Sequence, residues 1–476
     1  MANDKNFVKE VADINEDFAQ WYTDVVIKTD MVDYGPVKGT MVIKPYGYAV
    51  WENLQKYADA KFKAVGVQNA YFPMFIPESY LKREAEHVEG FAPEVAVVTH
   101  AGGAQLSEKL IVRPTSETII CEMYAKWIKS YRDLPVKMNQ WCNVVRWEKT
   151  TRPFLRTSEF LWQEGHTVYA NEEEAQADVK RMLDIYVDVA QDLLAIPVLS
   201  GRKTEKEKFA GAIATYGIEA IMKDGKCLQA GTSHYLGQNF AKASNIRFLN
   251  KESVLEYGYS TSWGISTRLI GALVMVHGDE RGVKMPPKVA PIQVVIVPIA
   301  SHKEGVIEKC KEVEKLLLSK GIRVKLDDTD NTPGWKFNEY EMKGVPVRLE
   351  IGPRDIENGV ACVVRRDTLE KSTLELNNIE NSVDSLLSDI QTNMFNMAKA
   401  NLDSAIVECD DFDEMVKHIE DKKVTLSYHC GEKECEENIK DGTAIKTRVI
   451  HSYDENHTCI KCGKQSKYRV YFGRQY

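Results

Sequence analysis

The stretch WCNVVRWEKTTRPFLRTSEFLWQEGH, residues 141–166, carries the pattern from which the fold class is predicted. It contains two short runs rich in β-branched and aromatic residues, 144–148 and 158–162, and a charged connection that includes Pro153. Two such runs around a polar segment predict two β-strands joined by a long hairpin loop. Taken alone, the pattern also fits a surface hairpin with a solvated basic tip.

The charged side chains of this hairpin follow an order that a solvated tip does not require. Arg146 and Glu148 alternate along the first predicted strand, so they share one face. Arg156 ends the loop, and Phe160 opens the second run. One face therefore offers two guanidinium groups, a carboxylate and an aromatic ring, which are the groups that hold a nucleotide.

The order R-x-E, loop, R-x-x-x-F resembles motif 2 of the class II aminoacyl-tRNA synthetases, and RWEKTTRPFLRTSEFLWQEGH resembles the prolyl-tRNA synthetases. The resemblance implies an α+β catalytic domain in which helices pack on an antiparallel sheet. It implies that Glu148 contacts the adenine amino group, that Phe160 stacks on adenine or forms a wall of the pocket, and that Trp162 offers an apolar wall to a pyrrolidine ring. The residues that it places at ATP in this segment are Arg146, Glu148, Arg156, Thr157 and Phe160.

Length and composition limit the alternatives. A chain of 476 residues is long enough for about two to three domains, and its net charge of −8 means that nucleic-acid binding would depend on local basic patches. The N-terminal segment MANDKNFVKEVADINEDF is neither a secretory signal nor a transit peptide, and no apolar run approaches the roughly 18 residues of a membrane span. The ten cysteines are scattered apart from four near the C-terminus, a pattern typical of a cytoplasmic protein with a metal site.

The segment before the hairpin predicts helices over 1–30 and 48–65. Residues 70–77, AYFPMFIP, place prolines in an apolar run, which favours an edge strand or an interface element over a loop. This segment resembles motif 1, the helix and strand of the class II dimer interface, with Pro73 at the proline position. The resemblance therefore implies a homodimer.

Residues 110–118, LIVRPTSET, predict a strand and then a helix over 117–129. Thr115 or Ser116 is a candidate N-cap, and from spacing alone capping is the favoured role. RPTSET also resembles the amino-acid pocket of the prolyl and threonyl-like branches, which implies that Thr115 and Glu117 bind the amine of proline. A carboxylate and a hydroxyl oxygen are suitable acceptors for a protonated secondary amine.

The region after the hairpin predicts a helix over 171–194 and a strand over 196–212, in which Phe209 lines either the core or a pocket. The sequence QAGTSH, 229–234, resembles the floor of the family's active site. This implies the positions of three side chains, with Gln229 and Thr232 near ATP and His234 near proline, although a lone histidine is more often structural.

Residues 260–271, STSWGISTRLIG, lead into an apolar helix over 272–277 and resemble motif 3. The resemblance implies that Ser266 and Arg268 lie at ATP and that Arg268 neutralises its phosphates; the alternative is an arginine packed along a helix face. Only about a hundred residues separate motifs 2 and 3. The chain therefore resembles the archaeal and eukaryotic type, which lacks the bacterial editing insertion, and we expect no proofreading in cis.

Residues 285–293, MPPKVAPIQ, predict a linker, and the apolar run 294–297 that follows suits a buried parallel strand. Alternating strands and helices then predict a small α/β domain with a mixed sheet. GVPVRLEIGPRD resembles the anticodon-binding domain of the prolyl, threonyl, histidyl and glycyl enzymes, which implies Glu341, Arg348 and Lys371 near the anticodon. Taken singly, each of these charges is more often a surface residue. The predicted elements are helices over 303–320 and 334–343 and strands over 323–326, 347–351 and 360–365.

The C-terminal segment carries paired cysteines, Cys430 with Cys435 and Cys459 with Cys462. Pairs at such short spacing predict a structural zinc site of tetrahedral thiolate geometry, for which His429, His451 and His457 are rival ligands. The C-terminal domain of archaeal and eukaryotic prolyl enzymes resembles this arrangement, which implies a small zinc-containing α+β domain.

The resemblance predicts ATP-dependent activation of L-proline and transfer of the prolyl group to the 3′ end of tRNA(Pro). No enzyme nucleophile is needed, because the proline carboxylate attacks the α-phosphate and the protein supplies positioning and charge stabilisation. The catalytic residues are then Arg146, Arg156 and Arg268, and Thr115, Glu117, Arg146, Trp162 and His234 hold proline. Mg²⁺ should accompany ATP, but no ligand is assigned to it, because Gln229 occupies a position where many class II enzymes have an acid. The predicted domains are 1–285, catalytic; 292–395, anticodon-binding; and 400–476, zinc-binding.

Three other functions compete with this prediction. A threonyl enzyme would need a zinc site of Cys and His in the amino-acid pocket, and no such set is found there. A non-catalytic regulator that binds tRNA should have lost the arginines of motif 2 or motif 3, which this chain keeps. The third is a zinc-stabilised RNA-binding module with a degenerate ATP site.

Overall fold

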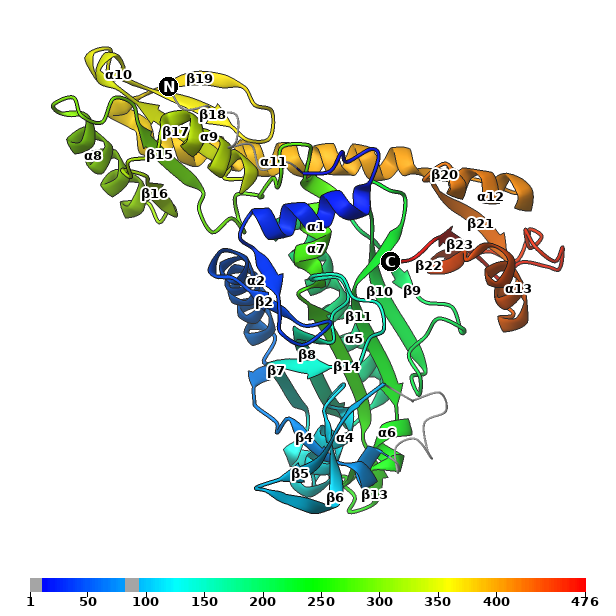
Figure 1. Cartoon of the computed structure of the whole chain (residues 1–476). Coiled ribbons are helices and arrows are strands. Elements are labelled where there is room, and N and C mark those ends of the chain that lie inside the picture. Colours follow the sequence, from blue (N-terminus) through cyan, green and yellow to red (C-terminus); the bar gives the residue numbers. More distant parts are fainter. Residues whose placement is uncertain (1–10, 82–93) are drawn as a thin grey trace.

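The computed structural model describes residues 11–81 and 94–476. Figure 1 shows a large body built on one long sheet, a second domain above it and a third beside it. The second and third domains are joined by the helix α11 (Ile379–Ala405), which runs unbroken across the end of the body. The architecture confirms the predicted α+β catalytic domain with two smaller domains. No helix among the described residues is long and apolar enough to cross a membrane.

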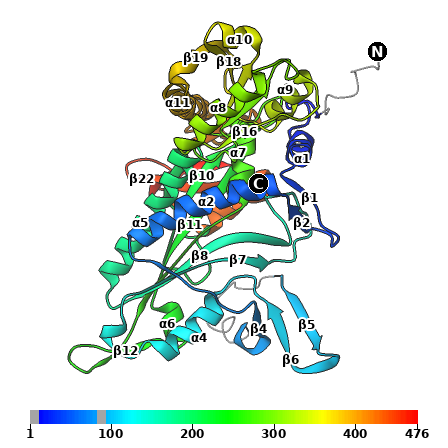
Figure 2. The same ribbon diagram turned by 90° about the vertical axis from the view of Figure 1, so that its left-hand side faces the viewer.

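The body is organised around a seven-stranded sheet of order β3-β7-β8-β14-β11-β10-β9, antiparallel except for the pair β3–β7. Helix α5 packs on one face of this sheet, with α2 beside it (Figure 2), and leaves the other face to the site described below. The core between sheet and helices contains Trp263, Tyr186 and Phe62. The strands are β3 (Gln68–Asn69), β7 (Val136–Val145), β8 (Glu159–Tyr169), β9 (Leu199–Arg202), β10 (Ala214–Ile221), β11 (Cys227–Gly237) and β14 (Tyr259–Ser266).

Local sequence explains where the long helices begin. At α5 the side chain of Asn171 accepts a hydrogen bond from the Glu174 N–H, and three glutamates in the first turn complement the helix dipole. At α2 a proline occupies the first turn, where its missing N–H costs nothing. The helices of the body are α1 (Phe18–Lys28), α2 (Pro45–Ala64), α4 (Glu117–Trp127), η2 (Tyr131–Asp133), α5 (Glu172–Asp188), the π-helical turn η3 (Val189–Leu193), α6 (Asn239–Ala243) and α7 (Arg268–His277).

The predicted hairpin is present, but its strands reach less far toward the loop than expected. β7 pairs with β8 from Val136 opposite Val168 to Val145 opposite Glu159. Arg146 and Glu148 follow the end of β7, so the prediction that both lie within the strand was wrong. Pairing nevertheless continues for one step, because the Arg146 N–H donates to the Ser158 carbonyl at 2.9 Å.

Two other element predictions were also wrong. The helix expected over 1–30 begins only at Phe18, because the Asp17 side chain caps it by accepting from the Gln20 N–H; residues 1–10 lie outside the described part. The strand expected over 196–212 is only the four residues of β9, and the chain then forms a loop before β10. The sequence did not predict β10 because its alternation includes buried polar residues.

Smaller sheets flank the body. The three-stranded sheet β4-β6-β5 contains the segment that resembles motif 1, and β4 is an edge strand as predicted. Within this segment Tyr71 is 73% and Phe75 47% exposed. The strands are β1 (Val32–Tyr34), β2 (Met41–Ile43), β4 (Phe75–Pro77), β5 (Ala96–Ala101), β6 (Ala104–Val112), β12 (Arg247–Leu249) and β13 (Leu255–Tyr257).

The second domain has a five-stranded sheet of order β16-β15-β17-β18-β19. β15 is parallel to both of its neighbours, whereas β17–β18 and β18–β19 are antiparallel, so the predicted mixed sheet is confirmed. Its elements are β15 (Val294–Pro298), α8 (Val306–Ser319), β16 (Val324–Leu326), α9 (Pro333–Met342), β17 (Val347–Ile351), α10 (Pro353–Glu357), β18 (Val360–Arg365), β19 (Lys371–Glu375) and η4 (Leu376–Asn378).

The connection between the first two domains is buried and tightly bonded, unlike a flexible linker. Val289 and Ala290 are fully buried in the core of the body. Asp279 accepts from the Arg366 guanidinium at 2.6 and 2.9 Å and is 3.1 Å from the Lys284 ammonium. Burial opposes ionisation of Asp279, but these cations outweigh it and lower the pKa of its carboxyl to about 2. The junction therefore fixes the second domain against the first.

The third domain has a four-stranded sheet, β20-β21-β23-β22, beside β9 and β10 of the body (Figure 1). It is attached by a buried ion cluster: Glu219 of β10 accepts from Lys203 and, at 2.8 and 2.9 Å, from Arg448 of β22. A buried charge with such partners is costly to separate, so this domain is not an independent tail. Its elements are β20 (Ile406–Glu408), α12 (Phe412–Glu420), β21 (Val424–His429), α13 (Lys433–Thr443), β22 (Lys446–Tyr453) and β23 (Tyr468–Gly473).

Candidate active site

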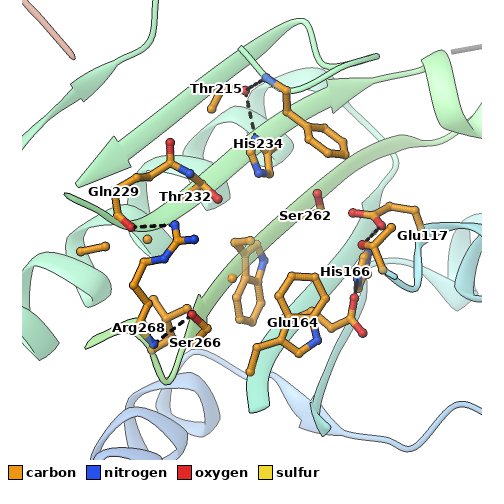
Figure 3. Close-up of a pocket in the computed structure, with 18 of the residues that line it drawn as sticks. Glu117, Glu164, His166, Thr215, Gln229, Thr232, His234, Ser262, Ser266 and Arg268 are labelled. Carbon is orange, nitrogen blue, oxygen red and sulfur yellow. Dashed lines mark hydrogen bonds and ion pairs between the residues drawn. The ribbon is translucent and has the colours of Figure 1, made fainter. Parts of the chain in front are cut away.

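The open face of the large sheet carries a cavity of about 240 Å³ (Figure 3). Its floor is formed by the adjacent strands β8, β14 and β11, which bring motif 2, motif 3 and the sequence QAGTSH side by side. Along β8 every second residue points into it, as period-two geometry requires, whereas β11 contributes residues on both sides of an irregular step in its pairing with β10. The predicted site residues that line it are Thr115, Glu117, Arg146, Phe160, Trp162, Gln229, Thr232, His234, Ser266 and Arg268.

Arg268 lies at the junction of β14 and α7 and contacts both other parts of the site. Its Nε donates to the Leu155 carbonyl in the motif 2 loop at 3.1 Å, and its Nη1 donates to the Gln229 carbonyl at 3.4 Å. Burial and the neighbouring arginines Arg146 and Arg156 lower its pKa to about 10, so it remains charged at neutral pH. Two cations, Arg146 and Arg268, line the one cavity and predict an anionic ligand.

Arg146 also lines the cavity and is held by stacking and by one backbone contact. Its guanidinium carbon is 5.5 Å from the ring centre of Phe160 and 5.3 Å from that of Trp162, and its Nε donates to the Pro114 carbonyl at 2.9 Å. Burial lowers the pKa of Arg146, while Glu117 and Glu164 counteract this effect. The stack leaves the guanidinium edge to bind a carboxylate or phosphate.

Thr115 and Glu117 face the cavity at the start of α4. The Thr115 hydroxyl donates to the Glu117 carboxylate, which is buried. Neither predicted cap is made by a side chain: Ser116 occupies the N-cap position, but its hydroxyl donates to Glu164 instead. The capping role favoured by spacing alone was therefore wrong.

Glu164 and His166 also line the cavity and were not predicted. Glu164 accepts from Gln140 Nε2 at 2.7 Å and contacts His166 Nε2 at 3.0 Å. Burial acts to raise the pKa of Glu164, but these hydrogen bonds prevail and the pKa lies below its usual value. Alternation along one strand was the available signal, because Phe160, Trp162, Glu164 and His166 occupy every second position.

His234 of β11 is on the far side of the cavity. Its Nδ1 lies 3.0 Å from the Thr215 hydroxyl, and its ring stacks on Phe209 with centroids 4.7 Å apart. Partial burial in the cavity wall lowers the pKa of His234 to about 3, so the imidazole is neutral at physiological pH. Phe209, for which the sequence allows either a core or a pocket position, lines the pocket.

Glu148, Arg156 and Thr157 are not among the residues that line the cavity. Arg156 and Glu148 form a 3.5 Å ion pair with each other, and the Thr157 hydroxyl donates to the Glu159 carbonyl at 2.7 Å. The loop that carries Arg156 is held by Tyr22 of α1, whose hydroxyl donates to the Pro153 carbonyl at 2.7 Å. The predicted ATP contacts of these three residues stay predictions.

The sequence matches known families over most of its length. Residues 101–277 match the tRNA synthetase class II core domain (G, H, P, S and T). Residues 293–386 match the anticodon binding domain, and residues 412–476 match the C-terminal domain of prolyl-tRNA synthetase.

Similar proteins extend the match to the whole chain. The proline–tRNA ligases of Acetoanaerobium sticklandii and Alkaliphilus oremlandii are each 59% identical over 477 residues, which covers 99% of this chain and 99% of each relative. The crystal structure of prolyl-tRNA synthetase from Cryptosporidium parvum complexed with halofuginone and AMPPNP is 42% identical with a TM-score of 0.94, covering 99% of this chain and 98% of that one. The chain belongs to the prolyl-tRNA synthetase family.

Membership of the prolyl-tRNA synthetase family makes this chain an enzyme, a proline–tRNA ligase of class II, as motif 2 predicted. Between β8 and β14 the prolyl-tRNA synthetase fold holds only the elements from α5 to β13. This short connection is consistent with the predicted absence of the bacterial editing insertion.

The three residues predicted at the anticodon do not form one cluster. Arg348 of β17 donates to Glu350 at 3.0 and 3.1 Å, and the Lys371 ammonium lies 3.0 Å from the same carboxylate. The Arg348 guanidinium also lies over the Phe337 ring, 4.0 Å from its centre. Glu341 instead pairs with Arg281 at 2.9 Å, near the junction of the first two domains.

The four cysteines of the C-terminal domain do come together. Cys435 Sγ is 3.8 Å from Cys459 Sγ, and Cys462 Sγ is 3.7 Å from Cys430 Sγ. His429 offers a ring nitrogen within 4.8 Å of the sulfurs of Cys430, Cys435 and Cys459. Of the other rival ligands, the His451 ring contacts the Tyr471 hydroxyl at 3.1 Å and His457 pairs with Asp454 at 3.3 Å.

Proposed function

We propose that this chain activates L-proline with ATP and transfers the prolyl group to tRNA(Pro), using the cavity on the large sheet as its active site. The observation that carries the proposal is that Glu117, Trp162, Arg146 and Arg268 line one cavity, with Glu117 and Arg268 on opposite sides of it (Figure 3). Exchange of pyrophosphate into ATP, measured with proline, alanine and cysteine, tests it. Exchange that depends on proline supports the proposal; its absence contradicts it.

The amino-acid end of the cavity suits a small cyclic amine. Glu117 and the Thr115 hydroxyl would accept from the protonated amine, and Trp162 would pack on the ring. We also assign Glu164, His166 and neutral His234 to this end, where they close the polar floor. A pocket of this kind separates near-isosteres by only about 1–3 kcal/mol per methylene, so discrimination against alanine and cysteine is limited.

The phosphate end would be handled by the arginines. Arg146 and Arg268 line the same cavity, and Arg146 is near enough to lower the pKa of Arg268, so a carboxylate and an α-phosphate held by these two arginines would be aligned for attack while charge develops. Gln229, Thr232 and Ser266 line the same end, and Glu148, Arg156 and Phe160 would hold the nucleotide from the motif 2 side. The Mg²⁺ that accompanies ATP would neutralise phosphate charge, and Gln229 offers an amide oxygen rather than a carboxylate.

The competing functions fit less well. A regulator that only binds tRNA has no reason to keep Arg146 and Arg268 buried in a shared cavity, because buried cations without a ligand are costly. A degenerate ATP site is opposed by the same arginines. The full-length match to proline–tRNA ligases opposes a synthetase for another amino acid.

The second domain is proposed to read the anticodon, through Arg348 in particular. Sequence-specific recognition of RNA usually targets unpaired bases, which an anticodon loop displays. Arg348→Ala should leave pyrophosphate exchange unchanged and slow charging of tRNA(Pro), because this residue lies outside the catalytic body. The size of one lost base contact is about 1–3 kcal/mol, or roughly tenfold or more in charging efficiency.

Two controls separate base recognition from loss of packing in this prediction. Exposed Arg354→Ala in the same domain should have little effect. A substituted anticodon should mimic the defect in the parent, and the two changes together should be less than additive. Full additivity, or an equal drop in exchange, would show that Arg348 does not read the anticodon.

The C-terminal domain is proposed to bind one structural zinc ion through Cys430, Cys435, Cys459 and Cys462. A tetrahedral site with Zn–S bonds of about 2.3 Å places its sulfur atoms about 3.8 Å apart, and the two measured sulfur pairs lie at 3.7 and 3.8 Å. The zinc would supply cross-linking, not chemistry, because all four positions around it are filled by protein.

We expect purified protein to contain about one zinc per chain, and Cys459→Ser to release it. His429→Gln is the matched variant: with four thiolate ligands it should keep the metal, although it removes the nearest rival. Elemental analysis of protein purified with a reductant measures both. If His429→Gln loses zinc while Cys462→Ser retains it, the fourth ligand is His429 and not Cys462.

Further features support a cytoplasmic homodimer. None of the ten cysteines forms a disulfide, which suits a reducing compartment. The exposed aromatic side chains of Tyr71 and Phe75 lie on the segment that resembles motif 1, where a partner subunit would cover them. The domain boundaries 1–285, 292–395 and 400–476 remain our proposal, with α11 shared between the second and third domains.

A further inference from the structure

The ion cluster between the C-terminal domain and the body has an unequal balance of charge. Lys203, Glu219 and Arg448 are each at most 2% exposed, and two cations share one carboxylate. Arg448 uses Nε and Nη2 on Glu219, at 2.8 to 3.3 Å. Such a cluster can lose one cation and still hold a neutral pair, whereas loss of the carboxylate would leave two unpaired charges.

Glu219 lies on the strand next to β11, which carries Gln229 at the end of the cavity proposed to bind phosphate. In the pairing of β10 with β11, Glu219 is opposite Gln229, at an irregular step of the register. The carbonyl of Gln229 is the one that accepts from Arg268 Nη1. Glu219 is also near enough to Arg268 to counteract the lowering of its pKa by burial. The strand position of Glu219 and the placement of Arg268 are therefore linked through one residue.

The C-terminal domain holds this cluster from its own side by a second set of bonds. Glu436 of α13 accepts from Thr447 at 2.8 Å and from Thr204 at 2.9 Å. Thr447 precedes Arg448 in the chain, and Thr204 follows Lys203. The Glu436 carboxylate therefore helps to fix the chain beside both cations. The helix that carries Glu436 is thus linked to the floor of the cavity by buried polar contacts, by chain neighbours and by the pairing of β10 with β11.

We infer that Arg448, although it lies in the C-terminal domain, is a positioning residue for ATP: it fixes Glu219, and through the Gln229 backbone it sets Arg268 at the phosphates. The inference rests on the proposed assignment of ATP to this end of the cavity. It predicts that a change at Arg448 affects the two substrates unequally. Of the groups proposed to hold proline, Thr115 and Glu117 lie at the start of α4, away from β10, whereas His234 contacts β10 through the Thr215 hydroxyl. A disturbance of Arg448 should therefore affect the binding of ATP much more than that of proline.

The test is pyrophosphate exchange by Arg448→Met in the full chain, with KM for ATP and for proline measured separately. We expect KM for ATP to rise about fivefold or more, the lower range of coupling between sites, while KM for proline stays within about twofold. Rates are divided by the number of active sites, counted from the stoichiometric formation of prolyl-adenylate. This division removes any effect of a smaller folded fraction, which would lower the rate but leave both KM values unchanged.

Two variants complete the design. Arg448→Lys keeps the charge but loses the two-atom contact with Glu219, so it should recover only part of the affinity for ATP. Arg469→Met removes an arginine of the same domain that pairs instead with exposed Glu408, at 2.7 Å, and should match the parent. The inference is overturned if KM rises equally for both substrates, if neither changes, or if Arg469→Met behaves like Arg448→Met. A parent enzyme without proline-dependent exchange would defeat the proposed function instead.

Discussion

Arg268→Ala should reduce the rate of proline-dependent pyrophosphate exchange by a hundredfold or more. The lost stabilisation of the transition state is about 3 kcal/mol or larger, the usual size for one electrostatic contact to developing charge. The structure explains why no neighbour can substitute. The Arg268 guanidinium is held by the carbonyls of Leu155 and Gln229, so its free edge has a fixed direction into the cavity. Alanine removes the cation and releases the motif 2 loop.

The controls for this experiment separate charge from geometry. Arg268→Lys keeps a cation but cannot span both carbonyls, so we expect an intermediate rate. Arg132→Ala, an exposed position of the same domain, should match the parent. Near-normal exchange by Arg268→Ala would remove motif 3 from the mechanism.

Glu117→Gln should raise KM for proline about ten- to a hundredfold and affect ATP much less. A hydrogen bond to a charged group contributes roughly 1.5–3 kcal/mol, and this substitution removes the charge while it preserves the shape. Glu117 is buried beside the Thr115 hydroxyl, so no water can easily replace the lost interaction with the substrate ammonium. Arg146 loses a favourable neighbour too, which should produce a smaller effect on KM for ATP.

Separate titration of proline and ATP in the exchange assay measures this difference. Glu122→Gln, on the same helix but outside the cavity, is the matched control and should leave both constants unchanged. If Glu117→Gln raised only KM for ATP, Glu117 would be a structural residue of α4. Another group would then have to accept from the amine of proline.

The sequence predicted the hairpin and the mixed sheet from runs of β-branched, aromatic or apolar residues, and the strand-to-helix junction of motif 3 from its resemblance to the family. It failed where polar residues are buried. Glu164 and His166 of β8 face the cavity, and Glu164 bonds to His166 and to Gln140 of β7, so these buried polar side chains break the alternation of apolar and polar positions. The strand limits around the site were misjudged for this physical reason.

Contacts between distant segments were beyond prediction from one sequence. Arg448 and Glu219 are separated by 229 residues, and each reads as an ordinary surface charge. Only the fold shows that their pairing removes both from water. The cysteine pairs were different, because thiolate spacing is itself a signal of metal geometry, and the predicted group did assemble.

The buried junction around Asp279, Arg366 and Lys284 keeps the first two domains at a fixed separation. With no free swivel between them, the distance from the catalytic cavity to the outer sheet of the second domain is built into the protein. An RNA would then be selected by its reach as well as by its bases: a molecule whose two functional ends are spaced differently could satisfy one domain only. Length itself would become a criterion of identity.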